Sequence, residues 1–193
     1  EIFSAGFHGG PLLIEAGRDV CLELTKKHKW PTSLAVLDSA GAGVTLLFST
    51  IPDSPMAPWR PMMGRKRSLL TTAMGRCYLA FCPEDERELL LRMLLASHPD
   101  KTEAAEIETS VQDMVRRARR LGYAERDPRA PPNSGSTVAM PIRRDGRVLG
   151  MVGIGYFKSA VHDRDVAKVL VAPLREAQAE IEKNVSALTR KKR

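Results

Sequence analysis

The sequence predicts an α+β domain, in which an antiparallel sheet is flanked by helices, on two observations. First, apolar residues alternate before the polar segment Arg143-Arg144-Asp145-Gly146, and a nearly all-apolar run follows it. Two such runs joined by a tip that ends in Asp-Gly give the strongest short-range signal of a β-hairpin. Second, helical and extended patterns alternate irregularly along the chain, and another hairpin is predicted at 33–51.

The second strand of the 136–157 hairpin is expected at the centre of the sheet and carries Gly150, Gly153 and Gly155. Glycine weakens a strand interior, so three of them suggest a bulge or the close approach of something to the backbone. Two interpretations fit these residues equally. The strand either forms the floor of a small-molecule pocket or is a core strand beside a helix that needs room.

Composition limits the class of protein. The 193 residues fit one domain with a substantial core, and 43% hydrophobic with 27% charged residues is ordinary for a globular protein. No run of 18 apolar residues could span a bilayer, and the start lacks a signal peptide and an initiator Met. We therefore expect a cytoplasmic protein that is a fragment of a longer chain. The net charge of +7 favours contact with polyanions or an anionic ligand.

Residues that carry chemistry are sparse. Cys21, Cys77 and Cys82 are odd in number and form no CxxC pair, which indicates buried thiols in a reducing compartment. The four histidines lack metal-binding spacing, so neither a metal site nor a cofactor is expected. GxSxG, HExxH, Walker A and GxGxxG motifs are also missing from the sequence. A pocket without catalytic groups is typical of a sensor domain, so we expect no enzyme.

The first third of the chain is predicted to form one helix and two strands. The helix covers 11–29, with Pro11 at its first position and apolar residues recurring every four positions. The strands cover 33–38 and 44–51. The sheet and its helices are expected within 33–157.

Residues 52–61 hold four prolines, which exclude a regular helix or a central strand. Met56 and Trp59 in this loop either fold back onto the core or cap a ligand. Thr71 or Thr72 is expected to cap the helix that follows. Small residues near the start of that helix permit close approach to its N-terminus, where anions bind well.

Three more helices are predicted. One is opened by Pro83, and the next covers 103–121 and ends at Gly122. Four arginines in its last turns either face solvent at the negative helix end or contact nucleic acid. The last helix covers 162–189, and Pro173 predicts a kink or a late start in it.

Three motifs, in this order and spacing, resemble the effector-binding domain of IclR-type transcriptional regulators: TTAMGRCYLAF at 71–81, RRLGY at 119–123 and VAMPI at 138–142. The resemblance covers essentially the whole chain. It implies a GAF-like curved antiparallel sheet flanked by helices, a homodimer or tetramer, and DNA binding through an N-terminal winged helix-turn-helix absent from this chain. WPT at 30–32 and LAFCP at 79–83 look most like members that control the catabolism of aromatic acids.

The resemblance also implies a ligand-binding pocket built from four regions of the chain. Its residues would be Met56, Trp59, Arg67, Ala73, Met74, Asp127, Thr137, Ala139, Gly153 and Gly155. The two glycines stand where sensors of small acids tend to have serines, which implies room for a larger and flatter ligand. Arg67 replaces the usual apolar residue, and its guanidinium could hold a carboxylate through two hydrogen bonds.

The function expected from this resemblance is the sensing of a small aromatic carboxylic acid that controls a catabolic operon. Two alternatives stay open at this point. The chain could be a small enzyme of similar shape that uses Cys77 or Asp127, or a GAF-like protein-interaction module without a ligand.

Overall fold

The computed structural model describes residues 4–38, 43–58, 64–96, 101–131 and 135–191. Its elements in chain order are helix α1 (Ser4–His28), strands β1 (Thr32–Leu37) and β2 (Val44–Ser49), the 3-10 turn η1 (Ile51–Asp53), strand β3 (Lys66–Arg67), helices α2 (Ala73–Phe81), α3 (Glu84–Leu95) and α4 (Lys101–Leu121), strands β4 (Ala124–Glu125), β5 (Gly135–Arg144) and β6 (Arg147–Phe157), the 3-10 turn η2 (Asp163–Asp165), the π-helical turn η3 (Ala167–Val171), and helix α5 (Ala172–Lys191).

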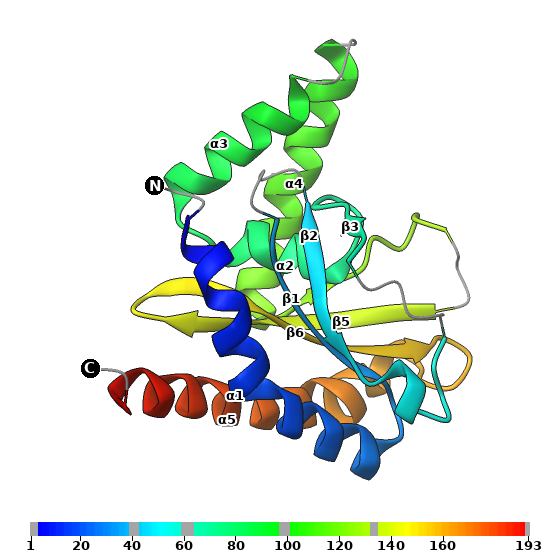
Figure 1. Ribbon diagram of the computed structural model, residues 1–193. Helices are drawn as coiled ribbons and strands as arrows, with labels where there is room; N and C mark the ends of the chain where they lie inside the picture. Colours follow the sequence, from blue (N-terminus) through cyan, green and yellow to red (C-terminus); the bar gives the residue numbers. More distant parts are fainter. Residues whose placement is uncertain (1–3, 39–42, 59–63, 97–100, 132–134, 192–193) are drawn as a thin grey trace.

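The strands form one six-stranded antiparallel sheet in the order β3-β2-β1-β6-β5-β4. The sheet curves, and helices flank both of its faces, as Figure 1 shows. The α+β fold expected from the sequence is therefore confirmed. The hairpin β5–β6 forms its middle, because β6 pairs with β5 on one side and with β1 on the other.

Each face of the sheet has its own hydrophobic core. Helices α1 and α5 pack against each other and cover one face, where Leu13, Leu174 and Ile181 are fully buried. Helices α2 and α4 cover the other face, where Leu79 and Leu90 are fully buried. Helices α3 and α4 form an arm that extends beyond the sheet (Figure 1).

The tip of the central hairpin has the geometry that Asp-Gly predicts. Asp145 and Gly146 have φ values of 51° and 76°, which match a two-residue turn with both central residues left-handed. Gly122, with φ of 80°, ends α4 in the same left-handed conformation.

Both ends of the domain differ from the predicted boundaries. Helix α1 begins at Ser4 and not at Pro11, because a proline inside a helix removes only one backbone hydrogen bond and the flanking turns continue. The segment 162–189 is not one helix, and the late start that Pro173 predicts is confirmed. It begins with η2 and the π-helical turn η3, and regular α-helix starts only at Ala172, next to Pro173, which cannot donate a backbone hydrogen bond.

The second strand and the loop after it also differ from the predicted bounds. Strand β2 ends at Ser49, and η1 follows it, with Pro52 in a helix-start position that needs no N–H. The predicted loop therefore opens with one 3-10 turn.

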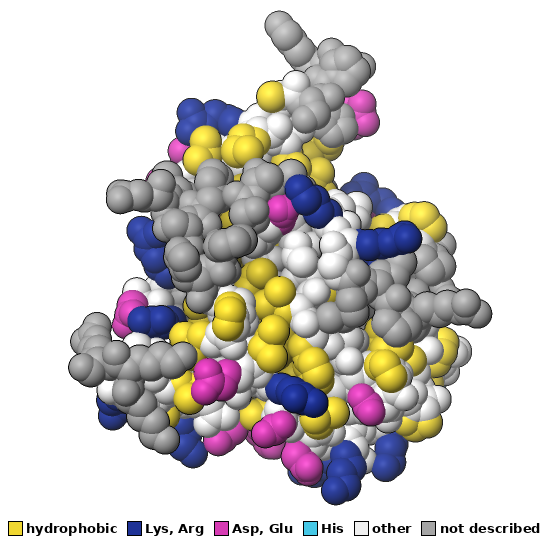
Figure 2. Space-filling view, in the orientation of Figure 1, with side chains coloured by type: hydrophobic (Ala, Val, Ile, Leu, Met, Phe, Trp, Pro, Cys, Tyr) yellow, Lys and Arg dark blue, Asp and Glu magenta, His cyan; other side chains and the backbone are white. Residues whose placement is uncertain are grey.

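The arginines at the end of α4 form contacts within the chain. Arg117 lies 3.0 Å from the Glu125 carboxylate, and Arg119 Nε donates to the Ala80 carbonyl at 2.7 Å. On the face shown in Figure 2, Lys and Arg side chains are scattered among Asp and Glu and do not form one continuous patch. These contacts favour an intramolecular role for Arg117 and Arg119.

Candidate functional site

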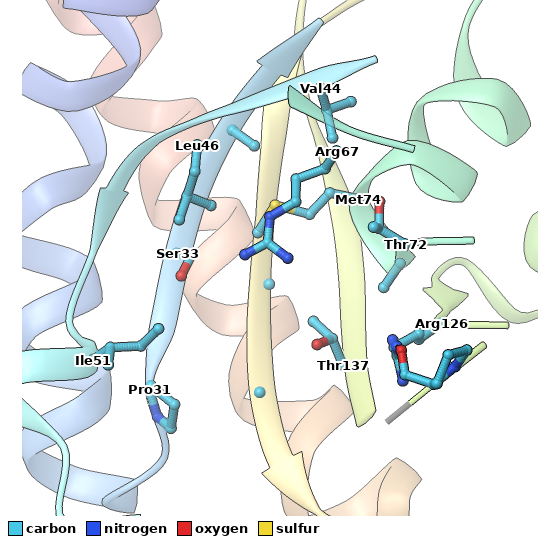
Figure 3. A pocket seen from close by; sticks show the side chains of 15 residues that line it. Pro31, Ser33, Val44, Leu46, Ile51, Arg67, Thr72, Met74, Arg126 and Thr137 are labelled. Carbon is cyan, nitrogen blue, oxygen red and sulfur yellow. The ribbon is translucent and has the colours of Figure 1, made fainter. Parts of the chain in front are cut away.

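A cavity of about 350 Å³ lies on the face of the sheet that α2 covers, beside the start of this helix. Its lining comes from β1, β2, β3, β5, β6, the N-terminus of α2 and the loop after β4 (Figure 3). The 15 lining residues are Pro31, Ser33, Ala35, Val44, Leu46, Ile51, Arg67, Thr72, Ala73, Met74, Arg126, Pro131, Thr137, Gly153 and Gly155. Most of these side chains are apolar, and the charged ones are two arginines.

Strand β6 forms the floor of this cavity. Gly153 and Gly155 are two residues apart, so both open toward the same face of the sheet. A Cβ added at Gly153 would lie 3.0 Å from Met74 Cε and 3.0 Å from the Val138 carbonyl oxygen. Gly150 opens toward the opposite face, where a Cβ would lie 2.4 Å from Leu13 Cδ2. Gly150 therefore fits the close-packing interpretation, and Gly153 and Gly155 border a cavity, whose use for a small molecule stays a prediction.

The start of α2 explains the Thr-Ala-Met-Gly sequence. Thr72 caps the helix, since its Oγ1 accepts a hydrogen bond from the Gly75 N–H at 3.1 Å. Ala73 and Met74, in the first turn, border the cavity. Gly75 is required by close packing, because a Cβ there would lie 2.4 Å from the Ser68 carbonyl oxygen. The unpaired N–H groups of this helix start favour an anion nearby.

Arg67 brings a positive charge into the cavity from the edge of the sheet. It lies on β3 opposite Val44 of β2, and its guanidinium extends over the middle of the cavity (Figure 3). Burial, and secondly the charge of Arg126, lower the pKa of Arg67. In the described ranges no carboxylate forms an ion pair with it, whereas neighbouring Lys66 pairs with Asp38 at 2.9 Å.

Arg126 and Pro131 close the side of the cavity next to β5. The Arg126 N–H donates to the Thr137 carbonyl at 3.2 Å, which extends the pairing of β4 with β5 by one residue. The Arg126 guanidinium donates to the Pro131 carbonyl. Neither residue was predicted, because nothing in the local sequence indicates that this loop runs beside β5 and so reaches the cavity.

Six of the ten predicted site residues line the cavity: Arg67, Ala73, Met74, Thr137, Gly153 and Gly155. Three others lie elsewhere. Met56 packs against the α1–α5 core, and Ala139 is fully buried in the core under α2. Asp127 forms ion pairs with Arg76 and Arg129 and does not border the cavity. Trp59 lies outside the described residues.

Four of the nine cavity residues that the sequence did not indicate lie on β1 and β2. Ser33 and Ala35 alternate on one strand, and Val44 and Leu46 on the next, so each pair faces the cavity. Ser33 lies directly opposite Gly153 in the sheet. The alternation is visible in the sequence, but the pairing of β1 with β6 is not.

The thiols are poor candidates for nucleophiles. Burial raises the pKa of Cys82 to about 12, and it also raises the pKa of Cys77, so neither thiolate forms readily at neutral pH. Among the described side chains, His, Cys, Asp and Glu do not gather into a group that could hold a metal ion. None of the helices in the described ranges is long and apolar enough to cross a membrane.

Comparison with known proteins identifies the family. The sequence pattern described as "Bacterial transcriptional regulator IclR C-terminal" matches residues 13–183. Similar folds occur in the IclR-family transcriptional regulator from Brucella abortus (18% identity, TM-score 0.72, 89% of this chain and 62% of that one) and in the IclR protein of Thermotoga maritima (19%, 0.73, 90% and 68%).

A third similar structure is the C-terminal domain of the E. coli transcriptional regulator KdgR (21% identity, TM-score 0.69), of which the chain covers 98%. The chain thus corresponds to nearly all of an isolated C-terminal domain but to 62% of the Brucella abortus regulator. Because the family pattern covers most of its length, this protein belongs to the IclR family of bacterial transcriptional regulators, in which it corresponds to the C-terminal domain.

Proposed function

We propose that this domain binds a small carboxylic acid in the cavity under α2 and thereby controls DNA binding by a domain outside the chain. The observation that carries the proposal is Arg67. Its guanidinium lies half-buried in a mostly apolar cavity beside a helix N-terminus, and within the described chain no carboxylate pairs with it. A carboxylate can satisfy such a guanidinium with two charge-assisted hydrogen bonds.

An aromatic body for this acid is a finer part of the proposal. The floor at Gly153 and Gly155 carries no side chains, and Leu46, Ile51 and Met74 supply apolar walls, so a flat ring fits the chemistry of the lining. An IclR homolog from Microbacterium hydrocarbonoxydans has been solved with 4-hydroxybenzoate, and its fold is similar (20% identity, TM-score 0.71). Control of a catabolic operon and assembly as a homodimer or tetramer are part of the same proposal and rest on the family alone.

The test compares acids with their uncharged amides. Benzoate and substituted benzoates should bind and raise the melting temperature, whereas the matching benzamides should not. A ligand at 100 times its dissociation constant adds about 2.7 kcal/mol to the free energy of unfolding. Arg67→Gln should weaken acid binding by at least about tenfold, because a hydrogen bond to a charged group is worth about 1.5–3 kcal/mol.

Arg65→Gln is the matched control, because Arg65 is exposed on the same segment and does not border the cavity. Equal losses of acid and amide binding in Arg67→Gln would remove charge recognition from the proposal. Conversion of a bound acid into a product, followed by chromatography, would favour an enzyme.

A further inference from the structure

One wall of the cavity carries a hydroxyl group whose hydrogen is already bound elsewhere. Ser33 borders the cavity from β1, and its Oγ donates a hydrogen bond to Ser49 Oγ of β2 at 2.9 Å. Ser49 Oγ also accepts a hydrogen bond from the Ile51 N–H at 3.3 Å. Ser49 is thus the acceptor in both hydrogen bonds, and the Ser33 hydrogen points toward β2.

The register of the sheet brings the Ser33 hydroxyl beside the cavity floor. Ser33 lies opposite Ser49 of β2 on one side and opposite Gly153 of β6 on the other. Gly153 has no side chain that could cover the hydroxyl. In Figure 3, Ser33 lies on one side of the glycine floor and Thr137 of β5 lies on the other side. A ligand that lies on this floor would therefore contact the β1 wall at Ser33.

The hydrogen bond to Ser49 decides what Ser33 can offer such a ligand. A serine hydroxyl has one hydrogen to donate and two lone pairs that accept. The hydrogen of Ser33 is bound to Ser49, and within the described part of the chain no group donates to the Ser33 oxygen. Ser33 therefore presents an acceptor to the cavity. A ligand atom that can only accept would face its lone pairs or break the hydrogen bond to Ser49.

The opposite kind of group comes from Arg67 and from the backbone N–H groups at the start of α2. Both can only donate hydrogen bonds. A carboxylate, which only accepts, is therefore suited to Arg67 and unsuited to Ser33. The two kinds of polar group border one cavity, so they would bind an acid in a single orientation.

We propose that Ser33 selects acids that also carry a hydrogen-bond donor, such as a hydroxyl or amino group, and that Ser49 imposes this preference by accepting the Ser33 hydrogen. Ser33 is then a specificity-determining residue, whereas Ser49 acts through it and is a positioning residue. This inference rests on the proposed function and adds a second polar group to the effector.

The test measures dissociation constants by isothermal titration calorimetry for the meta and para isomers of hydroxybenzoate, aminobenzoate and fluorobenzoate. The fluoro compounds are similar in size but have no hydrogen to donate. We expect the best donor-bearing acid to bind at least about fivefold more tightly than its fluoro analogue. Ser33→Ala should remove this preference and leave the affinity of the fluorobenzoate within about twofold.

Ser49→Ala separates the orientation of the Ser33 hydroxyl from its mere presence. This variant frees the Ser33 hydrogen, so that Ser33 can also donate to a ligand. Methoxybenzoates, which only accept, should then gain on the hydroxybenzoates, and the ratio of the two affinities should change by at least about threefold. A role of Ser49 in stability alone would weaken both kinds of acid equally and would contradict the proposal.

Ser186→Ala is the matched control, because Ser186 is an exposed serine of α5 that does not border the cavity. It should leave every affinity unchanged, and melting temperatures show whether each variant is folded. If Ser33→Ala does not fold, an unchanged affinity ratio in Ser49→Ala overturns the inference.

Two further outcomes would overturn the inference and leave the proposed function standing. One is equal binding of the fluorobenzoates and the donor-bearing acids by the unchanged protein. The other is a preference that persists in Ser33→Ala and is lost in Thr137→Val, because the selecting hydroxyl would then lie on β5. Binding of no acid in the series would overturn the proposed function as well.

Discussion

The glycines on the two faces of strand β6 have different surroundings. Toward α1, a Cβ at Gly150 would lie 2.4 Å from Leu13 Cδ2 and 2.7 Å from the Ala35 carbonyl oxygen, so neighbours already fill that position. Toward α2, Gly153 and Gly155 border a cavity of about 350 Å³. Gly150 is thus closely packed on one face, whereas on the other face Gly153 packs closely on Met74 and also borders the cavity with Gly155.

The helices above each face account for the difference. Helices α1 and α5, of 25 and 20 residues, pack together over the first face. Helix α2 has only nine residues, and it covers one part of the second face. The rest of that face is enclosed by the two-residue strand β3 and by the loop after β4. A short helix over this face of the sheet thus leaves a cavity that side chains do not fill.

The largest effect is expected on the closely packed face. Gly150→Ala should lower the free energy of unfolding by about 3 kcal/mol, because its Cβ meets a backbone oxygen and the side chain of Leu13. Gly10→Ala in α1 is the control, because its Cβ would lie at an ordinary 3.4 Å from Leu47 Cδ1. Urea unfolding of both variants measures the difference. Similar stabilities would contradict the tight packing of this face.

On the face of β6 that borders the cavity, replacing a glycine by a larger residue should reduce ligand binding more than stability. Gly155 does not have a positive φ, so its backbone accepts a side chain, and Gly155→Leu should occupy the cavity. We expect a stability change within about 1 kcal/mol and a loss of acid affinity of at least about 100-fold. Melting temperature and calorimetry on one sample give both values. A folded variant with normal affinity would show that the glycine floor is not the binding surface.

The sequence predicted those turns and helix ends that depend on residues close together in the chain. The Asp145-Gly146 turn, the Thr72 cap and the end of α4 at Gly122 all follow from backbone preferences of one or two residues. The pairing of β1 with β6 places Ser33 opposite Gly153, more than a hundred residues away, and no local pattern encodes that choice.

The buried face of α3 also differs from the face that helical periodicity predicts. Leu89, Leu90, Met93 and Leu94 suggest its buried face, yet Met93 is 40% exposed and Glu86 is only 5% exposed. Tyr78 of α2 donates a hydrogen bond to the Glu86 carboxylate, which gives this buried charge a partner. Helical periodicity cannot predict such a cross-helix partner. Arg126 was missed for a similar reason, since its place in the cavity depends on the pairing of β4 with β5.

The smallest effect is expected in the loop after β4, where Asp127 forms ion pairs with Arg76 and Arg129. Asp127 accepts hydrogen bonds from the N–H of Arg129 at 2.9 Å and from its Nε at 3.2 Å, and lies 3.6 Å from Arg76. Burial alone would raise the pKa of Asp127, but the hydrogen bonds from Arg129 and the charge of Arg76 lower it below the ordinary 3.8.

A carboxyl group whose pKa is lower in the folded state stabilises the fold at pH values above 3.8, and that contribution is lost as the pH falls through the folded pKa. Asp127→Asn should therefore reduce the free energy of unfolding at pH 7 by about 1 kcal/mol, because Arg129 is exposed and its pair contributes little, whereas the pair with Arg76 is largely buried. The difference from wild type should shrink as the pH falls below 3.8. Asp19→Asn, at an exposed position of α1, is the control and should change stability little at any pH. Urea unfolding at a series of pH values measures all three proteins. A difference that persists unchanged in acid would mean that Asp127 holds the loop by its shape and not by its charge.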